Sequence, residues 1–218
     1  MCGGGFAGAS RIARVEAATQ PGVPRERELS GAKALRIVEA MRTSVAARGI
    51  AGSTFDAVAG EAGVSRGLLH YYFGTKERLL LEVVRREAEV RTQRLERSIE
   101  AAADAEKVLD ALVRSFHDWL GDGPAPVMIY EMLTLAQRNE EIAGELAALG
   151  RRTRSHLADA LERKQQSGVL ALRVDAELAA MFLFALADGV IVRRLSEPDL
   201  DIGPLTEQAI AAARAVLN

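Results

Sequence analysis

The fold is decided by residues 53–80, which read STFDAVAGEAGVSRGLLHYYFGTKERLL. Ser53 is predicted to cap a helix, with Asp56 three positions later as its acidic partner in a capping box. Gly63 suits the tight turn that follows, and Ser65 is predicted to cap a second short helix. Two short helices separated by about four residues that include a glycine are typical of a helix-turn-helix.

Apolar spacing predicts the inner faces of these two helices. The predicted inward side chains are Phe55, Val58, Ala59 and Ala62 in the first helix, and Leu69, Tyr72 and Phe73 in the second. Upstream, apolar residues at helical spacing begin at Lys33, and Gly49 supplies a C-terminal stop for a preceding helix. Downstream, Thr75 is predicted to cap a longer helix that runs towards Ile99.

The stretch from Thr54 to Leu80 resembles the DNA-binding domain of TetR-family transcriptional regulators. The resemblance extends over roughly Lys33 to Val84, with its motifs in the family's order. It implies a three-helix DNA-binding domain followed by a mostly helical ligand-binding and dimerisation domain. It also implies that the last two helices pack against a partner subunit.

The outward face of the second short helix carries the side chains expected to meet the bases of a duplex. Arg66 is suited to a charge-assisted pair with a phosphate or a bidentate pair with guanine. Leu68 is suited to contact with a thymine methyl group, and Gly67 leaves room for a close backbone approach. Phosphate contacts set the register of the protein on DNA without reading its sequence.

Further contacts follow from the resemblance. Tyr71, Tyr72 and Lys76 resemble family positions that reach the sugar-phosphate backbone, and Ser53 or Thr54 would present a helix N-terminus to a phosphate. The complete predicted DNA-contacting set is Ser53, Thr54, Ser65, Arg66, Gly67, Leu68, His70, Tyr71, Tyr72 and Lys76. Leu68 replaces the small polar residue of many relatives, and His70-Tyr71 reverses their commoner aromatic-then-histidine order. The operator sequence is therefore not inherited from any relative.

The whole chain is predicted to be all-α. Beyond the helix-turn-helix, the expected helices are Ala105–Gly121, Pro126–Arg138, Glu140–Gln166, Asp175–Ser196 and Pro204–Leu217. We expect a mobile N-terminal arm over residues 1–30, a helix-turn-helix DNA-binding domain over 31–91 and a helical ligand-binding and dimerisation domain over 92–218. The arginines of the arm, Arg11, Arg14, Arg25 and Arg27, would either remain solvated or contact the DNA backbone.

The last two predicted helices carry apolar stripes that would pair with a second copy of the chain. The stripes are Ala179, Phe182, Leu183, Leu186, Val190 and Leu195, with Ile210, Ala213 and Leu217. The alternative is that they are buried within one subunit. A small-molecule pocket is expected between the central helices, lined by Phe116, Trp119, Met128, Tyr130, Met132 and Phe184. His117 and His156 have no partner motif, so neither a metal site nor a cofactor is predicted.

Composition fits a DNA-binding protein that acts in the cytoplasm. Residues 1–91 carry a net charge of +4 and residues 92–218 a net charge of −6, so the basic half holds the DNA-binding motif. The single cysteine lies in a glycine-rich start, and no signal peptide or membrane span is predicted. No phosphate loop, nucleophile elbow or metal cluster points to an enzyme. We therefore expect a transcriptional regulator, most simply a repressor released by a ligand, with an activator and a protein-binding adaptor as the alternatives.

Overall fold

The computed structural model describes residues 31–121 and 124–218, and within these ranges every regular element is an α-helix. The all-α prediction is confirmed, whereas the predicted arm over 1–30 lies outside the described residues. No helix in these ranges is long and apolar enough to cross a bilayer. The helices are α1 (Ala32–Gly52), α2 (Phe55–Ala62), α3 (Arg66–Phe73), α4 (Lys76–Glu100), α5 (Ala105–Gly121), α6 (Pro124–Ala136), α7 (Glu140–Gln166), α8 (Ala176–Ser196) and α9 (Gly203–Leu217).

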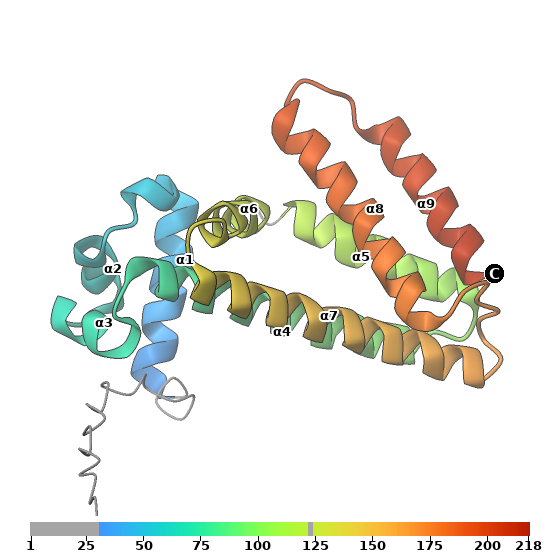
Figure 1. Cartoon of the computed structure of the whole chain (residues 1–218), viewed down its shortest axis with the longest axis horizontal. Coiled ribbons are helices and arrows are strands. Elements are labelled where there is room, and N and C mark those ends of the chain that lie inside the picture. The colour runs from blue at the N-terminus through green and yellow to red at the C-terminus, as the bar shows by residue number, and fades with distance from the viewer. Residues whose placement is uncertain (1–30, 122–123) are drawn as a thin grey trace, which may run out of the picture.

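The long helices α4 and α7 pack side by side and form the spine of the molecule (Figure 1). Helices α1, α2 and α3 gather at one end of this spine, while α8 and α9 lie towards the other. Helix α6 lies against α1, near the start of the spine. The helix-turn-helix and the two C-terminal helices therefore lie towards opposite ends of the molecule's long axis.

The predicted turns of the DNA-binding end have the expected backbone. Gly49 has φ 70° and ψ 173°, which interrupts α1 where a stop was predicted. Gly63 ends α2 with φ 62°, a left-handed conformation that suits a residue without a Cβ. Thr75 caps α4 by accepting a hydrogen bond from the backbone N–H of Arg78 at 3.3 Å.

The predicted cap at Ser53 is wrong, because Thr54 caps α2. The Thr54 hydroxyl accepts from the backbone N–H of Ala57 at 3.2 Å. Ser53 is fully buried instead, and its hydroxyl donates to the carbonyl of Gly49 at 2.8 Å. The break in α1 frees that carbonyl, and Ser53 satisfies it inside the protein.

Two hydrophobic cores lie along the spine. The first joins α1, α2, α3 and the start of α4 to α6 and the first half of α7. The second joins the end of α4 to α5, α8, α9 and the second half of α7. Helix α4 therefore runs without a break across the expected domain boundary at residue 91, and α6 packs with the DNA-binding helices although it comes much later in the chain.

Lys164 of α7 links the two long helices at the C-terminal end of α4. It is almost completely buried on α7, and its Nζ donates to the carbonyl oxygens of Glu100 at 2.7 Å and Ala102 at 3.0 Å. These groups lie at the C-terminal end of α4, where backbone carbonyls lack helical partners and attract a cation. The lysine thus ties the end of one long helix to the other.

Candidate DNA-binding face and effector cavities

Helix α3 is anchored on one side and open on the other. Leu69 and Phe73 are buried in the first core, as predicted, and Tyr72 is half-buried against it. On the opposite side the exposed predicted contacts are Ser65, Arg66, Gly67, His70 and Tyr71. Leu68 differs from expectation, because it is half-buried and packs against the first core. Its side chain therefore contributes to anchoring the helix.

Two further predicted contacts have partners inside the protein. Ser53 is buried, so of the two hydroxyl residues considered for a phosphate only Thr54 is exposed. Lys76 is half-buried, and its Nζ donates to the carbonyl oxygens of Ile50 and Ala51 at the end of α1. The lysine thereby joins the start of α4 to the end of α1.

Arg66, the first residue of α3, is held by neighbours on both sides. Its Nη1 donates to the carboxylate of Asp56 in α2, at 3.1 Å to Oδ2 and 3.4 Å to Oδ1. Its Nε lies 3.4 Å from Nε2 of His70, one turn along α3. The His70 Nδ1 lies 3.1 Å from the carbonyl oxygen of Gly74, and Phe55 meets the imidazole edge-on with ring centroids 4.8 Å apart.

A carbonyl oxygen only accepts hydrogen bonds, so His70 places its proton on Nδ1 and leaves Nε2 to accept from Arg66. Asp56, Arg66, His70 and the Gly74 carbonyl thus form one chain of hydrogen bonds across the exposed face. Sequence reasoning missed this arrangement, because Asp56 and Arg66 lie on different helices and no periodicity relates them.

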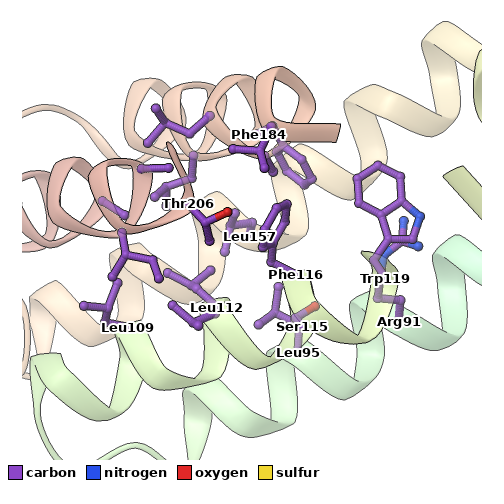
Figure 2. A pocket seen from close by; sticks show the side chains of 18 of the residues that line it. Arg91, Leu95, Leu109, Leu112, Ser115, Phe116, Trp119, Leu157, Phe184 and Thr206 are labelled. Atoms are coloured by element: carbon purple, nitrogen blue, oxygen red, sulfur yellow. The ribbon is translucent and has the colours of Figure 1, made fainter. Parts of the chain in front are cut away.

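A cavity of about 150 Å³ lies between α4, α5, α7, α8 and α9 in the second core. Phe116 of α5 and Phe184 of α8 project towards the same space, and leucines from several helices close it (Figure 2). Among the described lining residues Arg91 is the only charged one, and it lies beside Trp119 at one side of the cavity. Three of the predicted pocket residues, Phe116, Trp119 and Phe184, line this cavity.

A second, larger cavity of about 520 Å³ lies next to the first, between α4, α6, α7 and α8. The two cavities share Arg91, Trp119, Thr153 and Phe184, and the Arg91 guanidinium lies over the Trp119 ring at 4.7 Å from its centroid. Two more predicted residues, Met128 and Tyr130, line the second cavity.

The predicted pocket residue Met132 lies elsewhere. Its side chain is fully buried in the first core, where α6 packs with the DNA-binding helices. The apolar periodicity of α6 gave no means of separating its cavity-facing residues from those that face α1. Met132 is therefore a packing residue between α6 and the DNA-binding end.

The second cavity is more polar than the first. Its lining includes Glu87, Arg154 and Asp188 besides Arg91, and the Tyr130 hydroxyl donates to the backbone carbonyl of Asp188 at 3.4 Å. Desolvation raises the pKa of the Asp188 carboxyl, and the nearby Arg91 lowers it by a smaller amount. Desolvation, with Asp188 as a second cause, also raises the pKa of Tyr130.

The apolar stripes predicted for dimerisation divide into two groups. Ala179, Ala213 and Leu217 are buried in the second core, and Leu183, Leu186 and Ile210 pack against it. Val190 is also buried. Burial within one subunit, the alternative, is thus correct for most of them. Phe182 and Leu195 stay exposed, and they share a face of α8 with three other exposed apolar residues, Leu178, Met181 and Val192.

Comparison with known proteins gives this architecture a family. Residues 37–83 match the family model described as "Bacterial regulatory proteins, tetR family". Residues 103–218 match the family model described as "Tetracyclin repressor-like, C-terminal domain". The chain is 31% identical over 180 residues to the HTH-type transcriptional regulator BetI of Rhizobium meliloti, covering 81% of this chain and 82% of that protein.

Two solved structures share the fold. The regulator FadR from Bacillus subtilis in complex with stearoyl-CoA superposes with a TM-score of 0.65 at 22% identity, over 84% of this chain and 99% of that one. A regulator from Saccharomonospora viridis in complex with choline gives a TM-score of 0.62 at 25% identity, over 83% of this chain and 93% of that one. The chain therefore belongs to the TetR family and is a helix-turn-helix transcriptional regulator.

Proposed function

We propose that the protein is a ligand-responsive repressor that binds operator DNA as a homodimer through α3. The observation that carries this proposal is the exposed face of α3, which presents Arg66, His70 and Tyr71 while Leu69 and Phe73 fix the helix in the first core. A short helix anchored on one side has the form that enters a major groove. Because bacterial DNA lies in the cytoplasm, we expect a bacterial regulatory protein of this kind to act there.

The exposed face of α8 supports a homodimer. Leu178, Met181, Phe182, Val192 and Leu195 all retain more than two fifths of their residue surface in contact with solvent, and a helix face of this kind is normally covered by a partner. An isologous contact through α8 and α9 would bury it. Two copies of α3 would then engage half-sites about 34–36 Å apart, or a multiple of that distance.

Helices α4 and α6 support communication between the cavities and the DNA-binding end, because each belongs to both regions. Helix α4 contributes Arg91 to the shared wall of the cavities and Val84 to the first core. Helix α6 places Tyr130 at the second cavity and Met132 in the first core. A ligand that prefers one placement of these helices would change the spacing of the two α3 helices and lower the affinity for DNA.

The cavity linings favour an effector with a large apolar part and a smaller polar part. The first cavity is bounded mostly by aliphatic and aromatic side chains, while Arg91, Asp188 and Tyr130 offer polar partners in the second. Known pockets commonly combine an apolar lining with a few polar groups that fix orientation. The B. subtilis and S. viridis structures contain stearoyl-CoA and choline respectively, and we propose that a small molecule occupies the two cavities of this protein.

Operator binding is tested with the purified full-length protein and duplexes covering the promoter region of its own gene. We expect a discrete complex in an electrophoretic mobility shift that resists excess random DNA. Tyr71→Ala should weaken it, whereas Lys107→Ala, at an exposed i,i+3 pair on α5, should not. Absence of a specific complex on any promoter fragment, with the same helices capturing a protein, would favour the adaptor alternative.

Effector binding is tested by incubating the protein with cell extract and analysing what remains bound by native mass spectrometry. We expect a small molecule to stay with the wild-type dimer and not with Phe184→Trp, whose larger ring would fill space shared by both cavities. Adding that molecule should release the operator from the wild type. Unchanged operator affinity at saturation would contradict the release mechanism.

A further inference from the structure

The hydrogen-bonded chain on the DNA-binding face goes beyond general DNA binding and bears on which side chain selects a base. A free arginine side chain has many rotamers, and fixing one during complex formation costs free energy. Here Asp56 and His70 already fix the Arg66 guanidinium in the protein without DNA. Such preorganisation lowers the cost of a contact that requires a defined orientation.

Asp56 is an unusual neighbour for a surface that meets phosphates. Its side chain is 69% exposed on the same face as α3, where a carboxylate repels the DNA backbone. Beside Arg66 its negative charge offsets the attraction of the guanidinium for phosphates but leaves directional N–H donors in place. A phosphate contact gains most from charge, whereas a base contact gains most from direction. The pairing of Asp56 with Arg66 therefore favours a base contact.

The donors that remain on Arg66 point to the same role. Its Nη1 donates to Asp56 and its Nε to His70, while Nη2 has no hydrogen-bond partner within 31–121 or 124–218. The two N–H groups of Nη2 and the second N–H of Nη1 stay available for a ligand. Arg66 is also the first residue of α3, and the N-terminal residues of a recognition helix are those that contact base edges.

We propose that Arg66 reads a guanine in each operator half-site, with Asp56 and His70 as positioning residues that aim its guanidinium at O6 and N7. This inference rests on the proposed operator binding. Phe55 and the Gly74 carbonyl act one step further away, because they fix the His70 ring that accepts from Arg66. Each half of the operator therefore contains one guanine, and the preference of the protein for that guanine depends on Asp56 as well as on Arg66.

The test begins with selection of duplexes from a randomised library by the full-length wild-type protein. Dissociation constants are then measured by fluorescence anisotropy for the selected operator and for versions with each guanine replaced. Three variants are compared. Arg66→Met keeps a long side chain without any hydrogen-bond donor, and Asp56→Asn removes the carboxylate charge that pairs with Arg66. Glu61→Gln is the matched control, because Glu61 is also a carboxylate of α2 paired with an arginine, Arg48, away from α3.

The wild type should prefer guanine at one position of each half-site by about 5- to 150-fold, as expected for a bidentate contact. Arg66→Met should reduce this preference to below about threefold, and Asp56→Asn should reduce it by at least about threefold. Both Asp56→Asn and Glu61→Gln should bind random DNA more tightly, since each loses a negative charge. Of these two variants, only Asp56→Asn should show a reduced guanine preference.

Two results would overturn the inference while leaving operator binding intact. One is an Asp56→Asn protein with the guanine preference of the wild type, which would make the ion pair merely structural. The other is an Arg66→Met protein that retains the preference, which would assign the guanine to another side chain. A wild type that selects no sequence at all would overturn the proposed function itself.

Discussion

Met132 offers a direct test of how α6 is attached to the DNA-binding end. Its side chain is fully buried in the core that includes α1, α4 and α7. Met132→Ala would remove most of that side chain and leave a cavity, because the surrounding helices cannot close completely. Comparable buried truncations cost about 2–5 kcal/mol of unfolding free energy. In a chain of this size each kcal/mol lowers Tm by about 2–4 °C.

Leu133, the next residue of α6, is the matched control, because it is 45% exposed at the rim of the second cavity. Leu133→Ala should cost less than about 1 kcal/mol. Both variants and the wild type are unfolded in urea at one protomer concentration, since association changes the apparent stability of a dimer. Equal losses for the two variants would refute the assignment of Met132 to a packed interface between α6 and the DNA-binding helices.

Three further predictions concern other parts of the molecule. Asp188→Asn should increase stability at pH 7. Burial raises the pKa of the Asp188 carboxyl in the folded state, so the wild type loses stability as the pH rises from the ordinary aspartate pKa through the raised one. Urea titrations should therefore show that the variant's advantage over the wild type disappears by about pH 4. Lys164→Met should cost about 1–3 kcal/mol in the same assay, because two carbonyls at the end of α4 lose their donor, while Lys107→Met at an exposed ion pair should cost less than about 1 kcal/mol. Phe182→Glu should shift the mass in sedimentation from dimer to monomer at micromolar concentration, since the exposed face of α8 would then carry a charge; a dimer that is unaffected would place the interface elsewhere.

Local signals allowed the helices to be predicted closely. The predicted bounds Ala105–Gly121 and Glu140–Gln166 coincide with α5 and α7, because side chains that cap helices mark their starts. Asn139 had indicated only a weak break, yet its side chain accepts from the backbone N–H of Ile142 at 3.2 Å and starts α7. Capping, turns and apolar spacing are properties of short stretches, so one sequence is enough to detect them.

Contacts between helices were harder to predict. Ser53 and Thr54 are equally suitable caps by residue type, and the choice depends on the break at Gly49, whose carbonyl Ser53 satisfies. Met132 lies on an apolar helix that is packed on two sides, and periodicity does not say which side faces a cavity. Such choices depend on three-dimensional packing, which local patterns do not encode.

The position of Trp119 has a practical consequence. It is the only tryptophan in the chain, and its indole ring lies at the wall shared by both cavities with the Arg91 guanidinium above it. Ultraviolet emission excited selectively from indole therefore originates at this wall alone. Titrating the unlabelled protein in a fluorimeter would report occupancy of the cavities directly, without a dye, a tag or a substitution.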